Sequence, residues 1–291
     1  MTVLLLASLI TQVAAAPQTG TADESAVEAS AILDRSRQKL LDAPSLTMDI
    51  RIRARVDGRQ IEAIGRHVAG PFPQARTELT TELSGLRATR IEVCDGQVLW
   101  QISRFTDTTV EPVIDPISGR EQVDRTITRK DVDRVLAAIR TNGITTDQVL
   151  RAELGLGGLP AFLAGLDAAF DFRGQPGGGN SIVLRGGWRD GVVASHGIDP
   201  KRSRQTLPDL AELTLDRKTL LPTRLTYYQT GDGEPQKIVQ LDHLNIRVGD
   251  PVDARLFSYS PPTGATVEDT TARTLQEIEA AGRPESEPAT D

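Results

Sequence analysis

Residues Leu46–Val56 alternate strictly between two kinds of side chain, and this pattern limits the possible folds more than any other part of the chain. Six apolar residues would point to one side, and Thr47, Asp49 and three arginines would point to the other. A period of two predicts a β-strand with one dry face and one solvated face. Asp57-Gly58 follows and predicts a tight hairpin turn. We therefore expect an antiparallel sheet that is apolar on one face only.

Similar strand patterns recur along the rest of the chain, separated by turn residues. They predict further strands at residues 59–68, 75–83, 88–94, 97–105, 181–189, 210–216, 221–229, 236–248 and 255–260. Helices are expected at Asp23–Asp42, from about Asp131 to Gly143, and at Leu159–Phe170, where Pro160 suits the first turn. The count is about ten to twelve strands and about three helices, a mainly β domain with some α structure.

A broad sheet with one apolar face has few helices here to cover it. A curved sheet capped by short helices is a common way to enclose an apolar cavity. The alternative is a simple filled core, and the pattern alone does not decide between the two.

The first residues indicate export. Residues 1–16 combine the apolar run Val3–Ile10 with a small-residue stretch, the pattern of a cleaved signal peptide, although no Lys or Arg precedes the run. A buried N-terminal helix is the alternative. The body is expected at residues 23–271, followed by a polar tail at 272–291 that is too poor in apolar residues to fold. Cys94 is the only cysteine, so an internal disulfide is excluded.

No motif predicts catalysis or metal binding. His67, His196 and His243 are not at metal-ligand spacing, and Ser195 beside His196 lacks the third group of a catalytic triad. We therefore predict no enzyme activity, no metal site and no cofactor. The net charge of −7 argues against a nucleic-acid partner.

The arginines of the first strand, Arg51, Arg53 and Arg55, form a basic stripe. It is best explained as a solvated face paired with Glu78 and Glu82, and the alternative is a site for an anionic group.

Several motifs, in order along the chain, resemble the LolA-like family of periplasmic carriers that sort outer-membrane lipoproteins. One is the strand, Asp-Gly turn and Leu-Trp strand at residues 91–103, and two more lie at residues 213–228 and 243–257. The last is the Pro-Pro-x-Gly ending with its flanking residues, carried by Phe257, Pro261, Pro262, Gly264, Val267 and Asp269. The resemblance runs from about Ala31 to Thr270.

The resemblance implies an incomplete antiparallel β-barrel of about eleven strands, capped by about three helices over an apolar cavity. The cavity would take acyl chains, and a lid would comprise the helix from Asp131 and the apolar segment Leu154–Phe170. The expected cavity and lid residues are Met48, Ile50, Ile52, Leu79, Trp100, Ile102, Val132, Val135, Leu136, Ile139, Leu159, Phe162 and Leu163.

The chain also departs from the family. Gly70 precedes Pro71 where the family carries a basic residue linked to lid closure, so no arginine is assigned that role. Residues 106–123 and 191–210 make the chain longer than a typical member of the family.

The expected function is that of a monomeric periplasmic carrier for lipoprotein acyl chains or another lipid. It would act between an inner-membrane donor complex and an outer-membrane acceptor. The alternative is a periplasmic sensor that binds lipoproteins without carrying them.

Overall fold

The computed structural model describes residues 24–56, 58–109, 124–141, 158–175, 178–190, 192, 207–230 and 234–281. The expected signal peptide, most of both extra segments, and His196 lie outside these residues. No helix in the described ranges is long and apolar enough to cross a bilayer.

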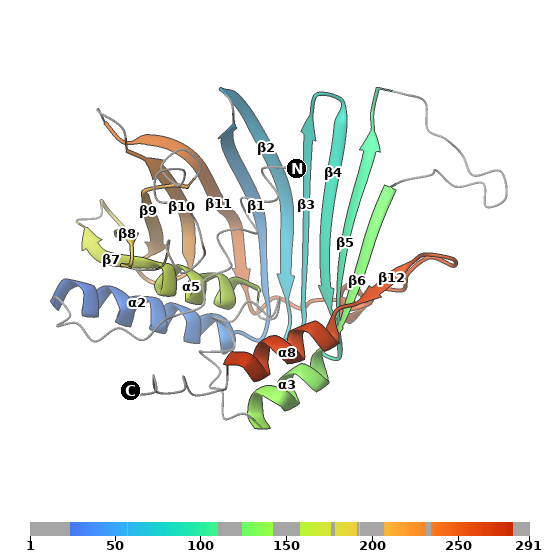
Figure 1. Cartoon of the computed structure of the whole chain (residues 1–291). Helices are drawn as coiled ribbons and strands as arrows, with labels where there is room; N and C mark the ends of the chain where they lie inside the picture. Colours follow the sequence, from blue (N-terminus) through green and yellow to red (C-terminus); the bar gives the residue numbers. More distant parts are fainter. Residues whose placement is uncertain are drawn as a thin grey trace, which may run out of the picture.

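One twelve-stranded sheet organises the described chain (Figure 1). Its strands are β1 (Leu46–Val56), β2 (Arg59–Ala69), β3 (Ala75–Leu83), β4 (Leu86–Cys94), β5 (Val98–Asp107), β6 (Asp124–Asp131), β7 (Phe170–Gln175), β8 (Ser181–Trp188), β9 (Leu210–Asp216), β10 (Pro222–Gln229), β11 (Gln236–Val248) and β12 (Val267–Asp269). Their spatial order is β12-β6-β5-β4-β3-β2-β1-β11-β10-β9-β8-β7.

The sheet is curved but open. Among the described strands, β7 and β12 form the two edges and do not pair with each other. All neighbouring strands are antiparallel except β12, which runs parallel to β6. The fold is therefore mainly β with helices, and the expectation of an incomplete antiparallel barrel is confirmed, with β12 as its one parallel strand.

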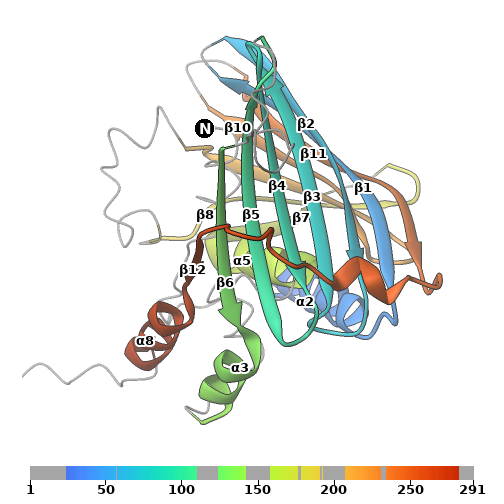
Figure 2. The same ribbon diagram turned by 90° about the vertical axis from the view of Figure 1, so that its right-hand side faces the viewer.

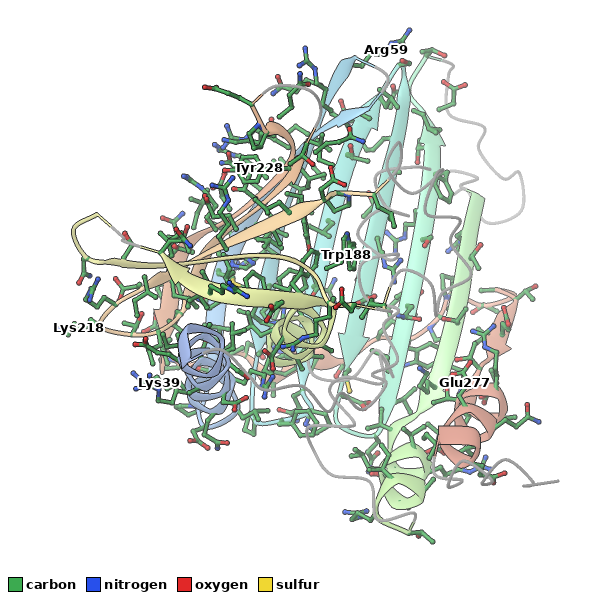
Figure 3. All side chains as sticks on the ribbon, turned by 60° about the vertical axis from the view of Figure 1, so that its left-hand side comes forward. Lys39, Arg59, Trp188, Lys218, Tyr228 and Glu277 are labelled. Atoms are coloured by element: carbon green, nitrogen blue, oxygen red, sulfur yellow. The ribbon has the colours of Figure 1, made fainter. Side chains whose placement is uncertain are left out.

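The helices form two separate groups. α2 (Glu24–Leu41) and α5 (Gly158–Ala169) pack together beside β7, whereas α3 (Val132–Thr141) and α8 (Thr271–Ala281) pack together below β5 and β6 (Figures 1 and 3). The described residues thus contain four α-helices rather than three.

α8 corrects the expected tail at 272–291. Residues 272–281 belong to this helix because Leu275 and Ile278 recur on one side and pack against α3. Ile278 is buried, so the segment has enough apolar surface to order itself. Residues 282–291 lie outside the described part of the chain.

The predicted strand at 255–260 is wrong. Its first residues belong to the short 3-10 helix η1 (Ala254–Phe257), and the chain then crosses the sheet as an extended segment that ends in β12. Pro261 and Pro262 lie in this crossing, where they need no ladder hydrogen bonds. We call residues 254–269 the strap, and Figure 2 shows it crossing β3 to β5 between η1 and β12.

The apolar face of the sheet changes sides between its two halves. Met48, His67, Thr77, Glu92 and Gln101 lie directly opposite one another on successive strands from β1 to β5, so they share one face. We call this the inner face, because α5 and α2 pack on it with Met48. It is apolar on β1 and mixed from β3 onward, where Thr77, Glu92 and Gln101 lie between apolar residues.

On the outer face of β4 to β6 the pattern is reversed. Ile91, Val93, Ile102 and Ile127 are buried there, although the outer face of β1 carries arginines. The strap covers this strip with Tyr259, Ala265 and Val267. The expectation that one face of the sheet is dry throughout is therefore wrong, since a second segment of the chain covers the other face.

The strap also limits the space for a side chain at position 70. A Cβ atom at this position would lie 2.9 Å from Oε1 of Gln74 and 3.1 Å from the Phe257 ring. Phe257 is buried in η1, so a side chain at the position that is basic in the resembled family would have to displace Gln74 and crowd this ring.

Candidate ligand-binding face

The largest core cluster fills the inner face between the strands β7 to β11 and the helices α2 and α5. Leu163 and Leu166 of α5 meet Leu213 and Leu225 of the sheet in this cluster. Phe170 lies at the start of β7 and stacks on Trp188, with ring centroids 4.3 Å apart. This half of the inner face is a filled core.

Buried charges tie α5 in place. Asp167 on α5 lies 3.5 Å from Arg37 of α2 and 3.6 Å from Arg189, which follows β8. Arg189 also donates a hydrogen bond to the Asp167 carbonyl oxygen at 2.9 Å. Breaking a buried pair by removing one partner typically costs about 3–5 kcal/mol. α5 is therefore anchored to α2 and to the end of β8.

A smaller apolar cluster lies beside this core, on strands only. Its buried members are Ile50, Ile52 and Ala63, and Leu79, Val239 and Leu241 pack against them while remaining partly exposed. We call these six residues the apolar patch. No helix contributes to this cluster. Val239 and Leu241 also pack against the larger core cluster that contains α2 and α5.

A chain of polar side chains borders the apolar patch on β4 to β6. Arg90 donates to Oε1 of Glu92 at 2.7 Å through Nη2, and Gln101 donates to the same oxygen at 3.1 Å. Thr128 in turn donates to Oε1 of Gln101 at 3.5 Å. We call Arg90, Glu92, Gln101, Thr128 and the neighbouring Lys130 the polar band. Burial lowers the pKa of Lys130, which Glu277 partly offsets.

His67 marks the boundary between the apolar core and the polar half. Its Nδ1 lies 2.8 Å from Oγ1 of Thr77. A Cβ on Gly158, the first residue of α5, would come within 2.9 Å of Cε1 of the ring, so the helix start rests on the histidine. Burial, followed by the nearby His243, lowers the pKa of His67 to about 4. The ring is therefore neutral at neutral pH.

The predicted cavity residues on the strands divide between the two faces. Met48 joins the core below α5, whereas Ile50, Ile52 and Leu79 form most of the apolar patch. Trp100 and Ile102 flank the inner-facing Gln101, so they lie on the outer face. The prediction that they line one cavity with Ile50 is wrong. A period of two shows that one face of a strand is apolar, but not toward which side of the sheet that face points.

The predicted lid residues divide as well. Leu159, Phe162 and Leu163 of α5 belong to the core with α2. Val132, Val135, Leu136 and Ile139 of α3 pack instead on Cys94, Leu99 and Ile278. The two helices therefore cover different ends of the inner face and do not form one lid. Residues 154–157 of the expected lid lie outside the described chain.

Sequence reasoning did not identify the polar band. Arg90 and Glu92 occupy polar positions of the expected strand at residues 88–94. Polar positions of an alternating strand are normally expected to face solvent. Only the strand register places them on the inner face, directly beside Leu79 and Thr77. No short motif carries this information.

No group of three or more His, Cys, Asp or Glu residues in the described ranges could hold a metal ion. Cys94 is buried, and burial raises the pKa of its thiol to about 11, so it is protonated and unreactive at neutral pH.

The basic stripe of β1 makes ion pairs on the outer face. Arg53 and Arg224 both reach Asp242 at 2.6 Å, and Arg51 lies 3.6 Å from Glu62. Burial would raise the pKa of Asp242, but hydrogen bonds from Arg224, Gln240 and Arg53 hold it below its usual value. Arg51 and Arg53 are thus paired within the sheet, although with other carboxylates than the expected Glu78 and Glu82.

Neither a protein-family model nor a curated protein sequence matches the chain. Solved structures to which it is similar include a DUF1329 family protein from Desulfovibrio piger, with 9% identity, a TM-score of 0.35, and coverage of 81% of this chain and 98% of that one. A LolA superfamily protein from Nitrosomonas europaea has 12% identity, a TM-score of 0.29, and coverage of 79% and 97%.

MucB, solved in complex with MucA(peri), has 15% identity and a TM-score of 0.36. The match covers 80% of this chain and 60% of that chain, so the chain spans less than two thirds of the length of MucB in that structure. The similar structures thus include a member of the group that the sequence motifs resemble, and the described chain is an open, helix-capped β-sheet that is divergent from each of them.

Proposed function

We propose that the protein is a non-enzymatic carrier that binds the acyl chain of a lipoprotein or another lipid on its inner face. The observation that carries this proposal is the apolar patch, a cluster to which no described helix contributes a residue and which borders the core filled by α2 and α5. Burying an acyl chain there would contribute about 0.8 kcal/mol per methylene.

The arrangement suits reversible binding. The filled core with its Asp167 ion pairs supplies rigidity, while Leu79, Val239 and Leu241 keep part of their surface accessible for a ligand. In this proposal the protein acts as a monomer in the periplasm, receives its cargo from an inner-membrane complex and delivers it to an outer-membrane acceptor. The motifs that resemble lipoprotein carriers support the same class of cargo.

The test compares two substitutions on neighbouring strands. Leu79→Asp places a charge in the apolar patch, whereas Ile64→Asp places the same charge on the outer face of β2, where Ile64 is 57% exposed. We expect Leu79→Asp to weaken binding of the uncharged probe N-phenyl-1-naphthylamine at least about tenfold, the equivalent of about two buried methylenes. Ile64→Asp should bind as the unmodified protein does.

Two further measurements decide the outcome. Circular dichroism must show that both variants keep the sheet, and organic extraction of the protein purified from its native compartment should yield lipid by mass spectrometry. Equal probe binding by both variants, or no lipid and no probe binding by the unmodified chain, contradicts the carrier proposal. Lipid binding without transfer between vesicles would favour the sensor alternative.

A further inference from the structure

The polar band lies where an acyl-chain carrier of uniform lining would have apolar side chains. Strand register aligns Thr77, Glu92, Gln101 and Thr128 in one row across β3 to β6. The next row begins with Leu79 and continues with Arg90. Apolar patch and polar band are therefore adjacent, because directly opposed residues on antiparallel strands have Cβ atoms about 5 Å apart.

Two charged groups of the polar band, those of Arg90 and Glu92, are partly exposed. The side chains of Arg90 and Glu92 form an ion pair, yet each is 32% exposed. The helices α2 and α5 pack elsewhere, and the cluster of α3 and α8 reaches only the end of these strands, at Cys94 and Leu99 (Figure 2). A ligand on the apolar patch could thus place its polar end against Arg90.

The band has a positive excess in an acidic protein. Arg90 and Lys130 contribute two positive charges and Glu92 one negative charge, whereas the whole chain carries −7. On α8, Glu277 and Arg273 act on the pKa of Lys130 in opposite directions, Glu277 raising it and Arg273 lowering it. A local excess of one positive charge fits a ligand group of one negative charge.

We propose that the polar band binds the anionic headgroup, a phosphodiester or a carboxylate, of an amphiphile whose apolar chain lies on the apolar patch. This inference rests on the proposed carrier function and adds the ligand class. Arg90 is the main contact, because its planar guanidinium can exchange part of its pairing with Glu92 for a bidentate bond to an oxyanion. Glu92 competes with the ligand, and Lys130 adds charge at the end of the row.

The test uses two lysolipids of equal chain length, lysophosphatidylglycerol and lysophosphatidylcholine, as competitors of N-phenyl-1-naphthylamine. We expect the unmodified protein to bind the anionic lipid about tenfold more tightly, the size of one hydrogen-bonded charge contact. Arg90→Gln should remove this preference. Glu92→Gln should increase the preference, a gain that misfolding would not produce.

Arg76→Gln is the matched control. Arg76 pairs with Glu78 at 3.1 Å, two residues apart as in Arg90 and Glu92, but on the outer face of the neighbouring strand. The Arg76→Gln variant should prefer the anionic lysolipid as strongly as the unmodified protein does. Thermal unfolding should show that all three variants are folded. Free glycerophosphoglycerol, the headgroup without its chain, should compete poorly.

Other outcomes would contradict the headgroup site, the assignment to an amphiphile, or the carrier function itself. Probe binding without a preference for the anionic lipid, or an equal loss in Arg90→Gln and Arg76→Gln, overturns the headgroup site and leaves the carrier proposal standing. Free glycerophosphoglycerol that competes as well as the lipid overturns the assignment to an amphiphile. Binding of neither probe nor lipid removes the proposed function itself.

Discussion

At the scale of single residues, His67 connects the apolar and polar parts of the inner face. It lies between Met48 and Thr77 in the register and directly below Gly158, where α5 begins. The folded state keeps both His67 and His243 neutral, since burial lowers each pKa to about 4. Protonating either ring would place a charge in a site that has little water to solvate it.

The pH dependence of stability follows from these pKa values. Between pH 6.5 and pH 4 the unfolded chain binds protons that the folded chain does not, so stability is complete above pH 6.5 and is lost as the pH falls. His67→Gln should remove up to about 1.4 kcal/mol per pH unit from this slope. Urea unfolding at several pH values measures it, with His243→Gln as a second, comparable variant. Parallel stability curves for His67→Gln and the unmodified protein would contradict this account.

At the scale of elements, the strap is the part whose role differs most from its sequence pattern. It begins at η1, passes Trp100 with Tyr259 at a ring-centroid distance of 5.5 Å, and ends in β12. Only three residues of β12 pair with β6. The other contacts are apolar packing on the outer face, an ion pair between Arg129 and Asp269, and a hydrogen bond from Arg76 to the Leu256 carbonyl oxygen. Such a segment should open locally at a lower free energy than the central strands.

Weakening the strap tests this expectation. Val267→Asp removes an apolar contact with the strip around Ile127 and places a charge there. Amide hydrogen exchange at residues 258–281 should accelerate about thirtyfold, which corresponds to about 2 kcal/mol. Exchange in β1 and β2 should be unchanged. Glu268→Gln, at the exposed neighbouring position, is the control, and equal exchange in both variants would show that the strap does not depend on this contact.

At the scale of the whole molecule, the sheet serves two purposes with its two faces. The inner face of β7 to β11 and β1 to β3 holds the filled core and the apolar patch, while the outer face of β4 to β6 is buried by the strap. The switch occurs within one continuous sheet, between β2 and β4. Stability and ligand binding are therefore expected to depend on different residues.

Ile102 provides a direct test of this separation. It is fully buried on the outer face, so Ile102→Val should lower the free energy of unfolding by about 1 kcal/mol. Binding of an apolar probe should not change, because Ile102 does not face the apolar patch. Urea unfolding and probe titration measure the two quantities on one sample. If Ile102→Val also weakened probe binding, Ile102 would have to be part of the binding surface.

The sequence by itself determined the local structure of most of the sheet. Alternation located β1, β2 and β11, and turn residues such as Asp95-Gly96 separated the hairpins. These features depend on interactions between near neighbours. The motifs that resemble lipoprotein carriers also predicted the open, helix-capped architecture.

Only the tertiary structure decided which face of each strand points inward. A period of two identifies a dry face, but its direction depends on the register and on what packs against it from afar. Gln101 therefore faces inward while Trp100 and Ile102 lie under the strap, a segment more than 150 residues later in the chain. The strap could not be recognised in advance, because an extended chain that packs through side chains has the same alternation as a strand that pairs through its backbone.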